Sequence, residues 1–573
     1  MTQEERSKIA SNEYADIILR YNGNPSSLGE LGKYTNHRIN EGSVVIYIPA
    51  SELTSRSVSE FGYSAIPKIY ALTSQQSLEA SGVTKLRRIP AANLRGQGVV
   101  VGIIDTGIDY MNPVFKHSDG TTKIISIWDQ TINSQDQTPY SVYPPYFGTE
   151  YTTEQINQAL KSDKPLEIVP SIDENGHGTM LAGIAAGSEN HENDFSGVVP
   201  DAELIVVKLK QAKAVLTNFY EIPANAACYQ ETDMMWAIQY IVDKARSIHR
   251  PLSVCIGLGT SQGAHDNSGF FNTSVSISAD FPEVCVLVSA GNEGNARRHF
   301  FSDLDPTAGP VTVELNVGEN ETGFSMELWG DPPTIYTLDI LSPTGEYIQR
   351  ISESLEGTRK ISFLFEQTII NVDYIMVEAE TGKQVIMMRF RNPTQGTWRF
   401  QIYGRGDLEG AFHIWLPSDG LISQNVYFLN ENPYTTITSP GNCYLPISIT
   451  AYDSNLNTHY FNSGRGYSTS NIINPELTAP GVNIQCPALN NGFTTITGTG
   501  AATAHATGIC AIILEWSIVK GNYPGIDTVG IKKFLIRGAK RSDNLQYPNR
   551  DWGYGVIDLF NSFNLLRTDI LGH

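Results

Sequence analysis

The chain has 573 residues, of which 41% are hydrophobic and 17% charged, and 60 acidic against 40 basic residues give a net charge of -20. At roughly 150 residues per domain this length predicts two to four domains, and the composition excludes disordered and fibrous proteins. The acidic balance disfavours nonspecific binding to nucleic acid or anionic membranes, so we expect neither as a partner.

The N-terminal sequence and the cysteines indicate a protein that is made and kept inside a cell. Residues 1–6, MTQEER, lack the basic and apolar regions of a secretory signal. No run approaches the ~18 apolar residues of a membrane span. The six cysteines are scattered without a CxxC pair, and several lie in apolar runs, so we expect buried free thiols, no metal site and no cofactor.

The first 76 residues are predicted to form a small α+β unit. Strand-like segments at 14–21 and 44–49 are followed by a mixed segment that ends near Leu72. A unit of this size is marginal on its own. The polar residues 73–77 that follow are typical of a linker or a processing site.

From Gly98 onwards, buried strands alternate with helices, one of them expected at 232–248 with its apolar face on Met234, Ile238 and Ile241. Continuous apolar runs are typical of strands that are buried on both faces of a parallel sheet. The order of elements therefore predicts a doubly wound α/β core. The runs expected as strands are 99–104, 203–209, 252–258 and 284–289.

Between residues 301 and 437 the pattern changes to about eight short strand-like segments separated by turns, which predict a β-sandwich or jelly roll. The α/β pattern resumes at 447–451, so we expect the sandwich to be an insertion. A structural role is favoured over a carbohydrate- or peptide-binding one, because no exposed aromatic cluster can be identified from the sequence.

Two segments place chemically capable side chains at the ends of predicted elements. Asp105 ends the apolar strand at 99–104, at the carboxyl edge of the sheet, where open α/β folds hold their sites. His177 begins a glycine-flanked helix in the segment NGHGTMLAGIAAG. There its ring could face both a carboxylate and a substrate, although either residue alone also fits a structural role.

A third segment, GTGAATAHATG at 498–508, predicts a glycine-rich turn that leads into an apolar helix at 509–514. Such a turn exposes a nucleophile at a helix N-terminus, where backbone N–H groups favour developing negative charge. The residue at the apex is Gly500, which has no side chain to attack a substrate. The chain order carboxylate, histidine, nucleophile turn is that of subtilisin, not of chymotrypsin or the α/β-hydrolases.

These segments resemble the subtilases, the subtilisin-like serine protease family, and the likeness covers the chain from about residue 80 onwards apart from the insertion. The jelly-roll-like insertion, the missing signal peptide and the 72 positions between Asp105 and His177 are similar to the Csp subtilases of spore-forming clostridia. Members of that group process a cortex-hydrolase zymogen during germination. Further matching motifs are GVVPDAEL at 197–204, SAGNEG at 289–294, TAPGV at 478–482 and GYGVI at 553–557.

The resemblance implies a subtilisin-like parallel sheet flanked by helices, with an N-terminal propeptide and an inserted jelly roll. Asp105 would orient the imidazole, His177 would act as general base, and Asn292 would donate to the oxyanion. The implied domains are 1–76 for the propeptide, 77–300 and 438–573 for the core, and 301–437 for the insertion. The residues that would bind an extended peptide by strand addition are Gly257, Leu258, Gly259, Ala290 and Gly291.

Gly500 is the departure from the family, because it stands at the register position of the catalytic serine, and neither Thr499 nor Thr503 can replace it without leaving the apex. Removing that serine from subtilisin lowers kcat by about 10⁶. We therefore expect a non-catalytic Csp-type pseudoprotease that works with other germination proteins, a protease or a cortex-hydrolase zymogen. The alternative is an active serine endopeptidase whose serine has been replaced artificially.

The missing serine also bears on the propeptide, which in this family leaves its C-terminal tail in the cleft and is released by autocleavage. The processing site is expected at Gln75, Gln76 and Ser77. Without a nucleophile that cut should not occur in cis, so we expect an uncleaved chain whose own residues near 72–76 fill the cleft. We expect synthesis inside the cell and deposition in the spore.

Overall fold

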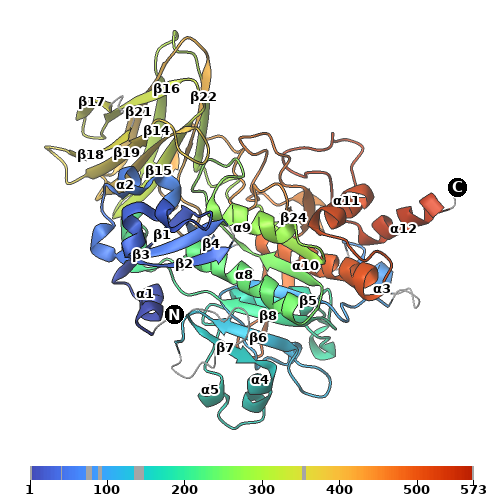
Figure 1. Cartoon of the computed structure of the whole chain (residues 1–573). Coiled ribbons are helices and arrows are strands. Elements are labelled where there is room, and N and C mark those ends of the chain that lie inside the picture. Colours follow the sequence, from blue (N-terminus) through green and yellow to red (C-terminus); the bar gives the residue numbers. More distant parts are fainter. Residues whose placement is uncertain are drawn as a thin grey trace.

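The computed structural model describes residues 3–40, 42–72, 80–87, 93–133, 147–351 and 356–570. Three bodies are visible in it: a small N-terminal unit, an α/β core and a β-sandwich that projects from one side of the core (Figure 1). The chain leaves the core for the sandwich after residue 298 and returns to it after residue 428.

A nine-stranded, mostly parallel sheet forms the centre of the core. Its strands are β5 (Val100–Asp105), β6 (Ile124–Asp129), β7 (Thr149–Thr152), β8 (Glu203–Lys208), β10 (Leu252–Ile256), β12 (Val284–Ser289), β24 (Ile447–Asp453), β25 (Thr458–His459) and β26 (Leu477–Pro480). They pair in the order β25-β24-β12-β10-β5-β8-β6-β7, with β26 beside β24. Only the pairs β6–β7 and β24–β25 are antiparallel. The central strands are buried on both faces, which explains their continuous apolar sequences.

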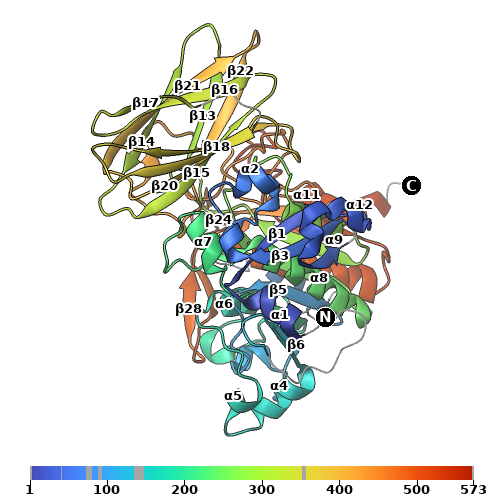
Figure 2. The ribbon, with the colours of Figure 1, turned by 60° about the vertical axis from the view of Figure 1, so that its left-hand side comes forward.

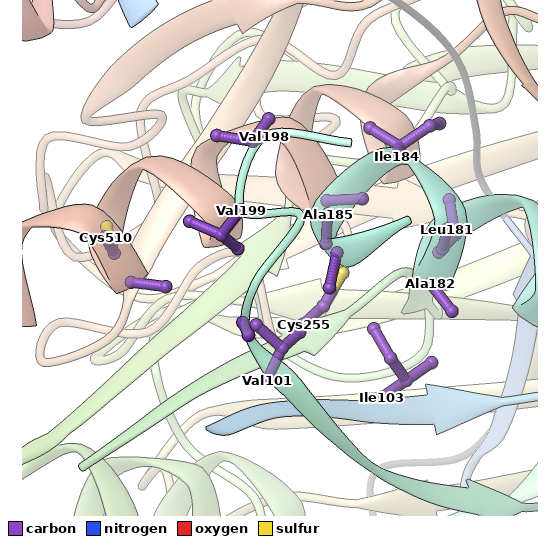
Figure 3. Packing of buried hydrophobic residues seen from close by; sticks show 14 of the residues in the cluster. Val101, Ile103, Leu181, Ala182, Ile184, Ala185, Val198, Val199, Cys255 and Cys510 are labelled. Atoms are coloured by element: carbon purple, nitrogen blue, oxygen red, sulfur yellow. The ribbon is translucent and has the colours of Figure 1, made fainter. Parts of the chain in front are cut away.

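Helices cover both faces of this sheet. On one face lie α6 (His177–Ala186) and α10 (Thr499–Leu514), and on the other α8 (Glu231–Ser247) and α9 (Phe270–Ala279). Alternate residues of β5 serve the two layers, because successive side chains of a strand point to opposite faces. Val101 packs with α6 and α10, as Figure 3 shows, whereas Val100 packs with α8.

Helix α10 is longer than the sequence predicts, since it begins at Thr499 and not near residue 509, and all of its residues are buried. Small side chains let it approach its neighbours closely: a Cβ on Gly508 would lie 2.4 Å from Cβ of Val198. Gly500 therefore lies in the first helical turn and not at the apex of a turn. Among the described residues, Thr499–Val519 is the one helix long and apolar enough to cross a membrane, and 83% of its most apolar window is buried in the core.

All six cysteines are free and buried, as expected.

The remaining helices lie at the periphery. A hairpin of β27 (Ile484–Pro487) and β28 (Phe493–Ile496) packs on α6. The peripheral helices are α1 (Gln3–Ala10), α2 (Ser57–Phe61), α3 (Val83–Arg87), α4 (Thr153–Leu160), α5 (Pro165–Ile168), α7 (Ala214–Phe219), α11 (Thr528–Gly538) and α12 (Leu559–Ile570).

The N-terminal unit lies between the core and the sandwich (Figure 2). Its antiparallel sheet has the order β1-β3-β2, with β1 (Tyr14–Arg20), β2 (Thr35–Asn40) and β3 (Ser43–Pro49). One face, which includes Ile18 and Val45, packs into the apolar cluster of α8 and α9. The other face, which includes Ile17 and Ile46, shares a cluster with Trp329 of the sandwich.

The sandwich consists of a six-stranded sheet, β13-β22-β15-β20-β19-β18, and a five-stranded sheet, β17-β16-β21-β14-β23. Its described strands number eleven against about eight expected: β13 begins ahead of residue 301, β17 is largely exposed and lacks an apolar alternation, and β23 has only two residues. Its strands are β13 (His299–Leu304), β14 (Val311–Val317), β15 (Gly323–Gly330), β16 (Ile335–Leu341), β17 (Tyr347–Ile351), β18 (Glu356–Ser362), β19 (Ile369–Ile375), β20 (Gln384–Arg391), β21 (Gly396–Arg405), β22 (Gly410–Trp415) and β23 (Tyr427–Phe428).

Candidate active site

Asp105 and His177 meet at the carboxyl edge of the central sheet. Asp105 is the last residue of β5 and His177 is the first residue of α6, and their side chains are 0% and 6% exposed. Oδ1 of Asp105 lies 2.7 Å from Nδ1 of His177 and also accepts the N–H of Thr106 at 2.8 Å. Since a carboxylate only accepts, Nδ1 of the imidazole donates, and in the neutral ring Nε2 is left as the basic nitrogen.

Asp173, which the sequence reasoning missed, holds this pair in place. One carboxylate oxygen accepts the hydroxyl of Thr106 at 2.8 Å and the N–H of Gly176 at 2.8 Å. The other oxygen accepts the N–H of Thr179 at 3.0 Å. Asp173 thereby ties the end of β5 to the first turn of α6. Its position just ahead of a predicted helix start is the sequence signal that could have revealed it.

Gly257 lies directly beside the Asp105–His177 pair. A Cβ at this position would lie 3.6 Å from Oδ2 of Asp105 and 3.6 Å from Cε1 of His177, but only 2.5 Å from Cδ1 of Leu181. A larger residue would therefore collide with α6. This places the first of the predicted peptide-binding residues next to the dyad.

The two predicted walls of the peptide groove meet at Thr438, another residue that the sequence reasoning did not identify. A Cβ on Gly259 would lie 2.2 Å from Oγ1 of Thr438, and one on Gly291 would lie 2.5 Å from the same atom. The N–H of Thr438 donates to the carbonyl of Ala290 at 3.1 Å. The segments 257–259 and 290–291, far apart in sequence, are thus brought to one place.

Asn292 is joined to the start of α10. Its Oδ1 accepts the N–H of Thr499 at 3.1 Å and the Thr499 hydroxyl at 3.3 Å. This assignment leaves the amide nitrogen of Asn292 as its donor. Gly500, the second residue of α10, follows at once, where the unpaired N–H groups of the first helical turn favour an anion.

A strand of the N-terminal unit pairs with the predicted peptide-binding segment at 257–259. β4 (Ile69–Leu72) lies between β11 (Leu258–Gly259) and β9 (Tyr229–Gln230) and is antiparallel to both. Leu72 pairs with Leu258. Leu258 directly follows Gly257, the residue beside the Asp105–His177 pair. The predicted processing site, Gln75, Gln76 and Ser77, lies outside the described residues.

A buried ion pair also fastens the N-terminal unit to the core. The ammonium group of Lys213 donates to Oδ1 of Asp16 on β1, and the side chains are 2% and 3% exposed. Oδ2 of Asp16 accepts from Nε2 of Gln230 at 3.0 Å and from the hydroxyl of Thr232 at 2.9 Å. Burial lowers the pKa of Lys213, and the Asp16 carboxylate opposes that shift. The Asp16 carboxylate is thus fully engaged with the core.

The arrangement provides an oriented imidazole and an amide donor, but position 500 is a glycine and supplies no attacking oxygen. In the described parts of the chain, no group of three or more His, Cys, Asp and Glu side chains is placed to hold a metal ion.

A cavity of about 30 Å³ lies where the three bodies meet, lined by Lys68, Glu231 and Glu378 among others. That volume suffices for two or three water molecules, since one needs ~10–15 Å³.

Comparison with known proteins places these features in a family. The model of the subtilase family matches residues 96–313 and 420–555. The fold is similar to that of the CspB protease of Clostridium perfringens, with a TM-score of 0.75 and 30% identity over 85% of this chain and 98% of that one.

Two curated relatives are more distant in sequence. Identity is 24% over 498 residues to the subtilisin-like protease SBT3.1 of Arabidopsis thaliana, covering 81% of this chain and 59% of that protein. It is 24% over 303 residues to the serine protease AprX of Bacillus subtilis, covering 52% of this chain and 54% of that protein. The chain thus spans less than two thirds of the length of either relative.

Proposed function

Because this chain belongs to the subtilase family, we propose that it is a Csp-type member without protease activity, which regulates spore germination while its own propeptide fills the cleft. Its fold is subtilisin-like, with an extra all-β body, and it is similar to the CspB protease. The observation that carries the proposal is Gly500, which stands next to Thr499 and Asn292 where a subtilase has its serine.

Neighbouring hydroxyls are engaged elsewhere. The hydroxyl of Thr499 donates to Oδ1 of Asn292 at 3.3 Å, and that of Thr503 donates to the carbonyl of Thr499 at 2.7 Å. The Thr503 bond is an ordinary helical contact one turn further along. Both hydroxyls therefore donate to groups other than His177.

Residues 1–76 act as the retained propeptide in this proposal. The pairing of Ala71 with Gly259 and of Leu72 with Leu258 is the strand addition by which such a groove binds an extended peptide. A chain that cannot cut itself keeps this segment as a permanent occupant of the cleft. The regulatory partners would be other germination proteins of the spore, a protease or a cortex-hydrolase zymogen.

The test is to assay purified full-length protein for self-cleavage by mass spectrometry and for hydrolysis of peptide substrates. The native chain should remain at its full mass of 63.0 kDa and show no activity. Gly500→Ser should cut itself a few residues after Leu72, whereas Gly500→Ala, the matched control, should not. Hydrolysis by the native chain would contradict the proposal.

The alternative, an active endopeptidase whose serine has been replaced, is favoured by one observation. The contact of 2.7 Å between Asp105 and His177, which an active enzyme requires, is intact. Sequencing the genomic codon for position 500 separates the two functions. A glycine codon supports the pseudoprotease, and a serine codon supports the enzyme.

A further inference from the structure

Three histidines and a tryptophan stack where the sandwich meets the core, and we call them the imidazole stack. The ring of Trp415 in β22 lies 4.1 Å from that of His265 and 4.8 Å from that of His413, centroid to centroid, and is nearly parallel to both. His299 in β13 stacks on the same indole at 4.9 Å. The three histidines are 3%, 1% and 8% exposed, in the order His265, His299 and His413.

One hydrogen bond in the stack limits the protonation of His299 and His413. Nε2 of His299 lies 2.9 Å from Nδ1 of His413, so the two rings cannot both be protonated, because two N–H groups would then face each other. Nδ1 of His299 lies 3.1 Å from the carbonyl of Asn432, and Nε2 of His265 lies 3.0 Å from that of Ser261. Each carbonyl accepts a hydrogen bond from a ring N–H, which a neutral imidazole can supply.

Burial keeps these rings neutral well below neutral pH. It lowers the pKa of His265 to about 4 and that of His299 to about 3, and it lowers the pKa of His413 well below its usual range. Two charged side chains act on the stack from outside it. Asp266 favours protonation of His265, whereas Lys383, which forms an ion pair with Asp331 at 2.8 Å, opposes it.

The loop 261–265 connects the stack to the strand in the cleft. Oε1 of Gln262 accepts the N–H of Ile69 in β4 at 2.8 Å. The N–H of Gly263 donates to Oε2 of Glu327 at 3.0 Å, and the same oxygen accepts the hydroxyl of Tyr63 at 2.6 Å. One short loop therefore contacts the sandwich, the stack and the N-terminal unit.

We propose that the imidazole stack makes the junction acid-sensitive: protonation separates the sandwich from the core and, through the loop 261–265, loosens β4 from the cleft. The sign follows from linkage. A histidine that is buried in the closed junction has a lower pKa there than in the open junction, where its pKa is near 6.5. Above about pH 6.5 the closed junction therefore keeps its full stability, and this stability is lost as the pH falls from 6.5 towards the lowered pKa of the closed state. The proposal does not depend on Gly500, because no residue of the stack touches the dyad.

Hydrogen exchange of the full-length protein at pH 7.5 and pH 5.0, corrected for the intrinsic exchange rate, tests this. Peptides covering 299–304, 411–416 and 69–72 should lose protection at pH 5.0, whereas those of α10 should keep it. Each histidine that titrates normally in the open junction shifts the opening equilibrium by about 30-fold between these pH values. Equal loss in α10, or no loss at the junction, would overturn the proposal.

A variant isolates the effect of one ring. His265→Phe keeps an aromatic ring against Trp415 but cannot be protonated, so its junction should open less at pH 5.0 by about 30-fold relative to the native chain. His191→Phe, which changes an exposed histidine, should leave the pH response as it is. A His265→Phe protein with the full response would contradict the proposal, and if this variant does not fold, the exchange of the native chain still decides.

Discussion

At the scale of single residues, the contacts that position His177 also join β5 to α6. Asp105 orients the ring at 2.7 Å, and Asp173 ties Thr106 to the first turn of α6. These contacts hold β5 against α6, and they are present although position 500 is a glycine. Their retention is therefore consistent with a structural contribution that outlasts catalysis.

Asp173→Ala should lower the free energy of unfolding by about 3 kcal/mol, because it leaves several buried donors without a partner. Urea unfolding followed by circular dichroism measures this. In a Gly500→Ser background the same change should lower kcat more than it changes KM. Asp163→Ala, at an exposed position, is the control and should have no effect; an Asp173→Ala protein as stable as the native chain would contradict the structural role.

Asp16→Ala should weaken the docking of the N-terminal unit, because it leaves Lys213 buried without its carboxylate. Breaking a buried pair costs about 3–5 kcal/mol. The exposed pair Lys164–Glu167, whose side chains are 72% and 68% exposed, is the comparison, and Glu167→Ala should cost less than about 1 kcal/mol. Equal effects in thermal unfolding of the two variants would show that the Asp16 pair does not hold the unit.

At the scale of elements, helix α10 organises the core. It packs on α6 and against β10, β12 and β24, and its small residues allow those close contacts. Gly508→Ala should therefore destabilise the protein by about 1–3 kcal/mol, because the added Cβ would lie 2.4 Å from Val198. Gly525→Ala, where nothing lies within 4 Å, should be close to neutral. Comparison of the two midpoints in urea checks this.

Five strands of the central sheet, β5, β8, β10, β12 and β24, and the meeting of Asp105 with His177 could be predicted because each coincides with a strong local signal, whereas β6, β7 and β25 were not predicted. Buried parallel strands have continuous apolar runs, and the two residues stand at the ends of elements within recognisable motifs. α8 was placed within one residue of its observed bounds, Glu231–Ser247. The local sequence pattern therefore predicts a helix or strand when the pattern lies within that one element.

Features that depend on contacts between distant segments could not be predicted. Thr438 is defined by its contacts with Gly259 and Gly291, and neither lies near it in sequence. The early start of α10 results from tertiary packing of a glycine- and threonine-rich segment that favours a turn on its own. The apolar run at 361–365 is likewise only partly a strand: β18 ends at Ser362, and Leu364 and Phe365 are 87% and 83% exposed in the loop that follows.

At the scale of the whole molecule, the pairing of β4 with β11 and β9 is not the only contact that holds the described N-terminal unit. The unit contacts the core through Asp16 and Lys213, and the sandwich through the ring contact of Tyr63 with Trp329 at 4.8 Å. Cutting the chain after Leu72 would remove neither contact. Release of the unit therefore requires separation from both bodies.

A chain cut at a sequence-specific protease site introduced between Leu72 and Ala80 should keep its N-terminal fragment bound during size-exclusion chromatography at neutral pH. The double variant Asp16→Ala, Tyr63→Ala, cut in the same way, should release the fragment, because both sets of contacts are lost. Release from the otherwise native cut chain would show that the covalent link, and not the buried surface, retains the unit.

The position of α10 near the end of the chain has a consequence for the order of events on the ribosome. β10 and β12 emerge early, yet α10, the helix that packs against them on the face shared with α6, begins only at Thr499. Domains generally fold as they are synthesised, N-terminal first. Here the α10 side of β10 and β12 must wait for its helix until the whole sandwich has been translated. Translation of the sandwich therefore delays completion of the core, and during this interval the nascent chain exposes apolar surface to chaperones and to aggregation.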